Sequence, residues 1–357
     1  MKENGLSQAH DNILSPMTTQ KSDRLDQATK LLEIRDLKIS YKTYRGDAKV
    51  VDGICLNIAR GEKIGLVGES GCGKTTTMKT ILRLLPDYQI KKPDGKILFN
   101  GNDILQMSQN ELLQIRRKSI AMVSQEPMAA LNPVFSVGQQ MGDVIKHSNR
   151  HSMATKSEIR DLCLDTIANV LIPDGERILK SYPHQLSGGM RQRICIAMAL
   201  LTQRDLIIAD EPGTALDVTI QDQIHKLLHN LTENIQLALI MITHSLGVAR
   251  ELVDRIYIMY AGTIVETANT KDLLRDPRHP YSIGLMECVP RLSGGGFASG
   301  IYGYVPDYVN APQGCRFSAR CPYSMDICKR QKPQLTKVDN DHFVACFRYE
   351  NHSISFE

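Results

Sequence analysis

One octapeptide constrains the fold of this 357-residue chain more than any other segment: Gly68-Glu69-Ser70-Gly71-Cys72-Gly73-Lys74-Thr75. It fits the phosphate-loop pattern G-x-x-x-x-G-K-[ST], in which a strand runs into a glycine-rich loop that opens a helix. The apolar run 64–67 precedes it, and Met78, Ile81 and Leu82 follow at helical spacing. The octapeptide therefore predicts an α/β fold with a site for a nucleoside triphosphate.

The loop supplies the groups that a triphosphate and its magnesium ion require. Gly71 and Gly73 let backbone N–H groups approach the phosphates, and the start of the helix adds partial positive charge. Lys74 is expected to bridge the outer phosphates, and the Thr75 hydroxyl to bind Mg²⁺. The predicted nucleotide-binding residues of this segment are Gly68, Ser70, Gly71, Cys72, Gly73, Lys74, Thr75 and Thr76.

An acidic pair, Asp210 and Glu211, ends another apolar run at 206–209, and Pro212 stops the strand there. In α/β sheets ligands bind at the carboxyl ends of the strands. Asp210 is therefore expected to hold Mg²⁺, and Glu211 to act as the general base that polarises the attacking water. A general base of this kind typically accelerates the reaction by about 10² to 10⁴-fold. The alternative is an acidic pair that merely ends a strand.

A second anion cradle is predicted where Ser187, Gly188 and Gly189 open another helix. One ATP cannot easily use two such cradles from one compact domain. With a phosphate loop before it and an acidic pair after it, this segment makes the chain resemble the ATPase subunit of an ABC transporter. The resemblance implies that Ser187, Gly188 and Gly189 cover the γ-phosphate bound to a partner subunit, so that two subunits close on two ATPs.

The resemblance assigns three further residues. Gln125 matches the glutamine that senses Mg²⁺ and water, and His244 matches the histidine that contacts the γ-phosphate. The implied catalytic set is thus Glu211, His244 and Gln125, and the implied magnesium set is Thr75, Gln125 and Asp210. Tyr41 matches the aromatic residue that stacks on adenine. It can equally be a core aromatic residue, and Tyr44 is a rival for the role.

The chain departs from the family pattern near the acidic pair. Gly213 stands where threonine is usual and adds backbone freedom to the loop that meets the partner subunit. This bears on the coupling between the two sites and not on the chemistry at Glu211. Ser245 replaces the usual aspartate, and Ser124 the usual phenylalanine, without removing a catalytic group.

Strands alternate with helices along most of the chain, which predicts a mixed, mostly parallel sheet covered by helices. The expected architecture is a P-loop NTPase of the ABC ATPase type with a helical insert and a small cysteine-rich C-terminal domain. The polar start, 1–30, is expected to be a flexible extension. The ATPase domain is expected at 31–290 with its insert at about 125–185, and the C-terminal domain at 291–357, after a glycine-rich linker.

Charge and hydropathy limit the kinds of partner that the chain is expected to bind. The formal net charge of +4 is too small and too dispersed for a nucleic-acid-binding face. There is no run of 18 apolar residues and no apolar signal segment at the start, so any membrane role is expected to be peripheral.

Several segments resemble the importer ATPases for oligopeptides, dipeptides and nickel, and the likeness spans roughly 31–347. They include 125–128 (Gln-Glu-Pro-Met), 277–281 (Pro-Arg-His-Pro-Tyr) and 312–317 (Pro-Gln-Gly-Cys-Arg-Phe). The resemblance implies ATP-driven import of peptides or related small solutes from the cytoplasmic face of the plasma (inner) membrane. The implied partners are two permease subunits, an extracytoplasmic solute-binding protein, and a second ATPase subunit that is identical or homologous. The alternative is a soluble ABC ATPase of DNA repair or translation, which is disfavoured because those carry two ATPase units or a long coiled coil.

The tail contains four of the nine cysteines: Cys315, Cys321, Cys328 and Cys346. Their spacing is wider than in most structural zinc sites, and thiolates suit both zinc and iron–sulfur clusters. An odd cysteine number without a secretory signal argues against disulfides. A bound cluster, a zinc ion and four unligated thiols all remain open on these grounds. The resemblance implies a 4Fe-4S cluster, which we expect to staple the tail and not to take part in redox catalysis.

Overall fold

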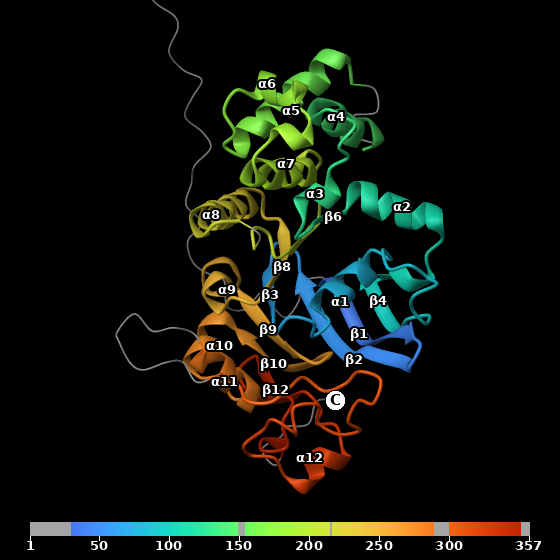
Figure 1. Cartoon of the computed structure of the whole chain (residues 1–357), viewed down its shortest axis with the longest axis vertical. Coiled ribbons are helices and arrows are strands. Elements are labelled where there is room, and N and C mark those ends of the chain that lie inside the picture. The colour runs from blue at the N-terminus through green and yellow to red at the C-terminus, as the bar shows by residue number, and fades with distance from the viewer. Residues whose placement is uncertain (1–29, 149–153, 215, 289–299, 351–357) are drawn as a thin grey trace, which may run out of the picture.

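The computed structural model describes residues 30–148, 154–214, 216–288 and 300–350. Two sheets and their covering helices form the body of the molecule, and a group of helices lies at one end of it (Figure 1). The predicted extension at 1–30 lies outside the described residues, except for Lys30. In the described ranges, no helix has the length and apolarity that a membrane span requires.

The first sheet is antiparallel, with the strand order β2-β1-β4-β5. Its long hairpin turns between Thr43 and Gly46. The sequence did not predict β4 and β5, so the expectation of one mostly parallel sheet omitted this second layer. The strands are β1 (Lys30–Thr43), β2 (Gly46–Ala59), β4 (Asp94–Phe99) and β5 (Asn102–Asp103).

The second sheet is mixed, with the order β11-β12-β10-β9-β3-β8-β7-β6. The strands from β9 to β6 run parallel, and β10, β12 and β11 are added antiparallel at one edge. The strands are β3 (Lys63–Val67), β6 (Ile120–Val123), β7 (Leu206–Asp210), β8 (Ala238–Thr243), β9 (Arg255–Tyr260), β10 (Thr263–Asn269), β11 (Thr336–Asp339) and β12 (His342–Val344).

The core lies on both faces of the parallel strands. Ile240 and Ile242 of β8 pack in the cluster that includes the antiparallel sheet, whereas Leu239 and Met241 pack in the cluster on the opposite face. Successive side chains of a strand point to opposite faces, so a strand covered on both sides reads as a continuous apolar run. This explains why the sequence of β8 is an unbroken apolar run from 238 to 242.

Helices cover the sheets and form the insert. The segment predicted as an insert, about 125–185, contains α3 to α6 and η3, and capping boxes at Ser136 and Thr155 fix the starts of α4 and α5. The helices are α1 (Lys74–Ile81), η2 (Ile104–Gln106), α2 (Gln109–Lys118), α3 (Pro127–Ala130), α4 (Val137–His147), α5 (Lys156–Asn169), α6 (Gly175–Lys180), η3 (Pro183–Gln185), α7 (Gly188–Leu200), α8 (Val218–Ile235), α9 (Leu246–Leu252), α10 (Thr270–Arg275), α11 (Pro280–Glu287) and α12 (Asp326–Arg330).

The tail returns to the same sheet that carries the phosphate loop. β12 pairs with β10 at Glu266 and Val344. The fully buried Glu266 carboxylate accepts hydrogen bonds from His342 Nε2 at 2.6 Å and from the backbone N–H of Arg278 at 2.7 Å and His279 at 2.9 Å. The predicted glycine-rich linker at 293–296 lies outside the described residues. The tail is thus bound to the ATPase body through a shared sheet and a buried carboxylate.

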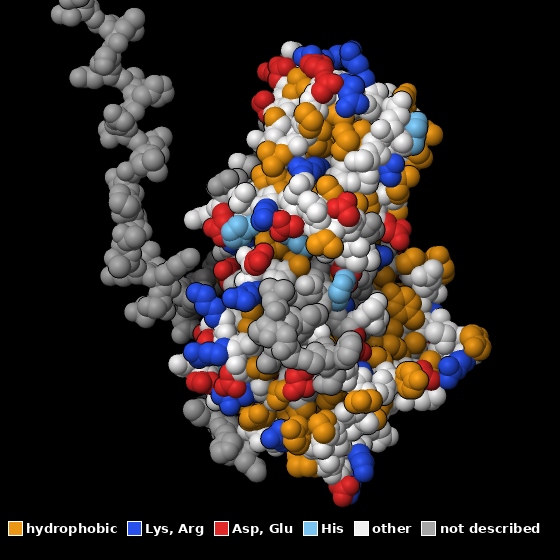
Figure 2. All heavy atoms as spheres, turned by 60° about the vertical axis from the view of Figure 1, so that its left-hand side comes forward, with side chains coloured by type: hydrophobic (Ala, Val, Ile, Leu, Met, Phe, Trp, Pro, Cys, Tyr) orange, Lys and Arg blue, Asp and Glu red, His pale blue; other side chains and the backbone are white. Residues whose placement is uncertain are grey.

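The surface carries both signs of charge. On the face shown in Figure 2, Lys and Arg side chains are interspersed with Asp and Glu and do not gather into one basic face. A nucleic-acid-binding domain concentrates its cations on one side. This face therefore offers no extended track for a phosphate backbone.

Candidate nucleotide-binding site

Three parallel strands bring the predicted site residues to one edge of the second sheet. Val67 at the end of β3 pairs with Thr243 of β8, and Asp210 of β7 pairs with Ile242. The phosphate loop, His244 and the acidic pair therefore leave the sheet at neighbouring positions. This edge is the carboxyl end of the parallel strands, where open α/β sheets bind their ligands.

The phosphate loop has the conformation that its glycines allow. Gly71 and Gly73 have φ values of 77° and 107°, in the left-handed region that favours glycine. The buried Lys74 ammonium donates hydrogen bonds to the carbonyl oxygens of Gly68 at 2.7 Å and Glu69 at 2.9 Å. A bound triphosphate would offer this ammonium charged oxygens in place of the two carbonyls. Lys74 therefore lies inside the loop where the outer phosphates are expected.

The remaining loop residues differ in exposure. Ser70 is exposed, whereas Cys72 is buried below the loop, and burial raises the pKa of its thiol. A buried cysteine of this kind behaves as a small apolar side chain. The structure therefore gives Cys72 a packing role, and its backbone N–H is the group it can offer to a phosphate.

The two predicted magnesium ligands from the loop and from β7 already meet. The Thr75 hydroxyl donates to Asp210 Oδ1 at 3.1 Å. Asp210 is 3% exposed, and burial raises the pKa of its carboxyl group, while the hydrogen bond from Thr75 opposes that shift. Oxygen ligands of this kind, one hydroxyl and one carboxylate, suit Mg²⁺ held together with substrate phosphates.

Glu211 is held in position beside Asp210 by two neighbours. Its carboxylate contacts His244 Nδ1 at 3.2 Å and accepts a hydrogen bond from the Thr214 hydroxyl at 3.3 Å. Glu211 has a φ of 46°, which is uncommon for a residue with a side chain. Strain of this kind persists where the surroundings fix the conformation, and it clusters at functional sites.

Gly213, the departure from the family pattern, has a structural reason in this chain. Its φ is 107°, so a side chain at this position would be strained whatever space surrounds it. The strained Glu211 and the left-handed Gly213 together turn the chain sharply between β7 and α8, which begins at the N-cap Asp217.

Tyr41 lies beside the phosphate-loop helix. Its hydroxyl is 3.4 Å from the Thr76 hydroxyl, and its backbone forms a bridge with Ile90. The rival Tyr44 is 98% exposed. The structure therefore places Tyr41, and not Tyr44, in contact with a predicted nucleotide-binding residue.

Two predicted elements stand apart from this constellation. Gln125 is exposed after β6, and no hydrogen bond joins it to the other predicted residues that the structure describes. The cradle at Ser187 begins α7, which lies with the insert helices in Figure 1. A Cβ atom on Gly188 would come within 2.9 Å of Leu216, and one on Gly189 within 2.7 Å of Ile220. The two glycines thus also permit close packing against α8 and the loop before it.

Comparison with known proteins identifies the fold and the family. Residues 51–214 match the family profile of the ABC transporter, and residues 265–328 match that of the oligopeptide/dipeptide transporter C-terminal region. The dipeptide transport ATP-binding protein DppD of Bacillus subtilis is 44% identical over 89% of this chain and 94% of its own length. The oligopeptide transport ATP-binding protein OppD of Escherichia coli is 41% identical over 90% of this chain and 94% of its own length.

This chain belongs to the family of dipeptide and oligopeptide ABC transporter ATP-binding proteins. Among solved structures, the ATP-binding cassette MJ0796, in a dimeric post-hydrolysis state bound to ADP and Pi, is similar with a TM-score of 0.60 and 28% identity. That likeness covers 67% of this chain and 98% of the other. The ABC ATPase fold and its ATP-hydrolysing activity follow from this membership.

The tail of this ABC ATPase touches the phosphate loop directly, which the sequence did not predict. The Tyr308 hydroxyl donates to the Gly71 carbonyl at 2.8 Å, and Arg320 Nη1 donates to both carboxylate oxygens of Glu69 at 3.2 and 3.0 Å. The Glu69 N–H donates to the Tyr281 hydroxyl at 3.0 Å. From the sequence, the only site residues predicted in the tail were its four cysteines. The one sequence feature that pointed to such a contact was Arg320, which directly precedes the predicted cluster ligand Cys321.

We expect Arg320→Gln to raise the KM for ATP about three- to tenfold with little change in kcat. Without the guanidinium, the Glu69 carboxylate has no cation beside it, and the phosphate loop is freer to move before ATP binds. ATP binding must then also order the loop, which lowers the affinity. Steady-state ATPase assays separate the two parameters, and calorimetry with ATP measures the affinity.

The matched control is Arg45→Gln. Arg45 pairs with Asp307 at 2.7 Å, so it also ties the tail to the body, but it does not touch the loop. An equal rise of KM in both variants, or none in Arg320→Gln, would show that the contact with Glu69 does not position the loop.

Proposed function

We propose that this chain is the ATP-binding and hydrolysing subunit that powers import of peptides, or of related small solutes, through membrane permease subunits. The observation that carries the proposal is the convergence of the Thr75–Asp210 and Glu211–His244 pairs with the phosphate loop at one sheet edge. Supporting it, relatives whose names specify dipeptide or oligopeptide transport match about nine-tenths of the chain. The soluble ATPase of DNA repair or translation gains no support from these relatives.

The proposed reaction follows from the positions of the side chains. Lys74 and the backbone N–H groups of the loop bind the outer phosphates, and Thr75 and Asp210 hold the magnesium ion that accompanies ATP. Glu211 accepts a proton from the attacking water as its oxygen bonds to the γ-phosphorus, and the bond to ADP breaks. His244 holds the Glu211 carboxylate and, together with Gln125, is proposed to contact the γ-phosphate and its water.

The second cradle requires a second subunit. In Figure 1, α7, which begins after the N-cap Ser187, lies with the insert helices and apart from α1, the helix that follows the phosphate loop. We therefore assign Ser187, Gly188 and Gly189 to the ATP of a partner ATPase subunit, identical or homologous, as the dimeric MJ0796 cassette suggests. The insert at about 125–185 is the proposed contact for the two permeases, because it lies between Gln125 and this cradle. The extracytoplasmic solute-binding protein and a peripheral place on the cytoplasmic membrane face complete the proposal.

The tail cysteines are proposed to hold a 4Fe-4S cluster. All four thiols are free of disulfides, and the pKa of Cys315 is raised to about 11, chiefly by burial and further by the neighbouring Cys328, Cys346 and Cys321. Backbone N–H groups two residues later point at three of the sulfurs: Phe317 at Cys315, Tyr323 at Cys321 and Arg348 at Cys346. Such hydrogen bonds stabilise thiolates that ligate a metal.

Support for the cluster comes from the four free thiols and not from a formed metal site. In the described residues no three His, Cys, Asp or Glu side chains lie where they could hold one metal ion. A zinc site would gather its four ligands about 2.3 Å from a single atom, whereas in a 4Fe-4S cluster each cysteine would bind a different iron. A bound cluster would staple the tail.

Glu211→Gln is expected to retain ATP binding but to lower kcat at least about 100-fold, because the amide cannot accept the proton of the attacking water. Phosphate-release assays measure the turnover. Size-exclusion chromatography with ATP and Mg²⁺ should show a trapped dimer. Glu287→Gln, which removes an exposed carboxylate from the end of α11, is the matched control. Turnover within about threefold of the parent would exclude Glu211 as the base.

Anaerobically purified protein is expected to contain about four irons and four sulfides per chain and to absorb broadly in the visible range. Replacing any one of Cys315, Cys321, Cys328 or Cys346 by Ser should reduce the iron content, whereas Cys55→Ser, at an exposed position on β2, should not. Stoichiometric zinc without iron would assign the site to zinc, and protein without either metal would leave four unligated thiols.

A further inference from the structure

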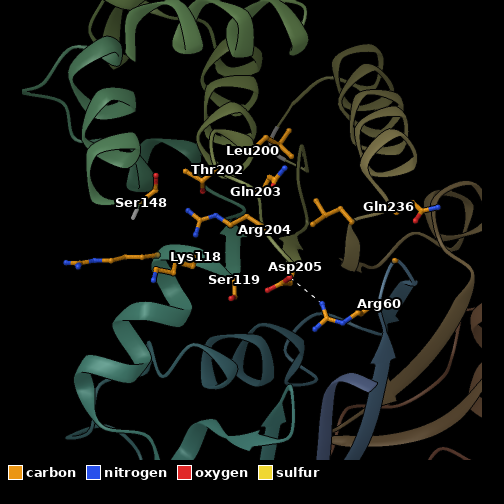
Figure 3. Close-up of a pocket in the computed structure, with 13 residues that line it drawn as sticks. Arg60, Lys118, Ser119, Ser148, Leu200, Thr202, Gln203, Arg204, Asp205 and Gln236 are labelled. Atoms are coloured by element: carbon orange, nitrogen blue, oxygen red, sulfur yellow. Dashed lines mark hydrogen bonds and ion pairs between the residues drawn. The ribbon is translucent and has the colours of Figure 1, made fainter. Parts of the chain in front are cut away.

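A cavity of about 720 Å³ lies at the edge of the sheet opposite the nucleotide site (Figure 3). It is lined by segments that precede β3, β6, β7 and β8, and by the ends of α4 and α7. ATP is expected at the carboxyl ends of these strands, so this cavity at their amino ends belongs to a different site. Its volume falls within the range of about 300–1,000 Å³ that is usual for small-molecule sites.

The charge of the lining is strongly positive. The lining contains four cations, those of Arg60, Arg117, Lys118 and Arg204, and one carboxylate, that of Asp205. Asp205 pairs with Arg60 at 3.4 Å. Within the described part of the chain, the other three cations have no ion pair. The cavity therefore holds more positive charge than its own residues neutralise.

Two buried polar atoms of the lining also lack partners. Thr202 is 5% exposed, and its hydroxyl forms no hydrogen bond with any residue that the structure describes. The same holds for the buried Nε of Arg204, whose Nη1 donates to the Arg116 carbonyl at 3.2 Å. Burial lowers the pKa of the Arg204 guanidinium because it disfavours the charged form. Leaving such groups unpaired is costly, so they are informative when they share one cavity.

Helix ends explain only part of this charge. Arg117 and Lys118 lie in the last turn of α2, where cations commonly interact with the negative end of the helix dipole. Arg204 follows α7 in the loop that leads into β7, and its Nε donates no hydrogen bond to any residue that the structure describes. In Figure 3 the Arg204 side chain extends between Thr202, Ser148 and the segment of Lys118 and Ser119. Two other segments of the chain thus approach the guanidinium of Arg204.

We propose that this cavity binds a phosphate-bearing ligand, with the Arg204 guanidinium and the Thr202 hydroxyl as its inner contacts. A guanidinium offers a planar fork of donors that matches phosphate oxygens, and the hydroxyl adds a further donor. Arg117 and Lys118 supply charge near the same group. The cavity exceeds the size of inorganic phosphate, so it accommodates a phosphorylated metabolite or a lipid phosphate headgroup.

The test uses the full-length chain carrying Lys74→Ala, which weakens binding at the phosphate loop. Calorimetry with pyrophosphate measures the binding of a soluble phosphate compound. Sedimentation with phosphatidylcholine vesicles that contain phosphatidic acid measures the binding of a lipid phosphate, with pure phosphatidylcholine vesicles as the blank. Adding Arg204→Gln should weaken binding about tenfold or more, because a charge-assisted hydrogen bond is lost. Thr202→Val should weaken it several-fold while preserving side-chain volume.

Lys226→Gln is the matched control, since it removes one exposed cation from α8, outside the cavity. Binding of either probe that depends on Arg204 and Thr202 but not on Lys226 supports the proposal and identifies the source of the phosphate. Equal binding by the Arg204 and Thr202 variants and their parent, or no binding of either probe, would overturn it. Because neither assay measures ATP turnover, this result is independent of the proposed import function.

Discussion

The parallel register of β3, β8 and β7 is the constraint on which the nucleotide site depends. Val67 opposite Thr243, and Asp210 opposite Ile242, bring three chain segments out at the same level of the sheet. Because side chains alternate along a strand, a slip of one residue in β7 would turn the Asp210 carboxylate to the other face. The register of these strands, which are buried on both faces, therefore also sets the distance between Thr75 and Asp210.

The loop after Glu211 connects the chemistry of one site with the cradle of another. It turns sharply through the left-handed conformations of Glu211 and Gly213 and then packs against the cradle, where Gly188 and Gly189 leave room for Leu216 and Ile220. On the proposed function, the cradle serves the partner's ATP, so a change at Glu211 reaches the opposite site through a short, closely packed segment. The packing contact alone forbids a larger side chain at either glycine, and the proposed anion contact would add a second reason for glycine there.

The sequence predicts those parts of the site that depend on local pattern. The phosphate loop, the acidic pair and the strands around them follow from motif and apolar runs, and the structure brings them together. The antiparallel β4 was not predicted, because it is short and half-exposed. The contacts of Tyr308 and Arg320 with the loop join residues more than 200 positions apart, and no local pattern encodes such a pairing. Ser187 is proposed to serve a partner subunit, and Gln125 is exposed without a hydrogen bond to the other predicted residues that the structure describes. Neither sequence periodicity nor this single chain therefore brings them to the phosphates.

The tail is best understood as part of the nucleotide site. It adds β12 to the main sheet, buries the Glu266 carboxylate against His342, and places Arg320 on Glu69 of the phosphate loop. The proposed ligands Cys315 and Cys321 enclose the short segment that ends at Arg320. Ligation at both cysteines would restrict that segment and lower the entropic cost of holding Arg320 in place. The proposed staple would therefore act on ATP binding through chain geometry, without any redox step, because the tail packs directly on the phosphate loop.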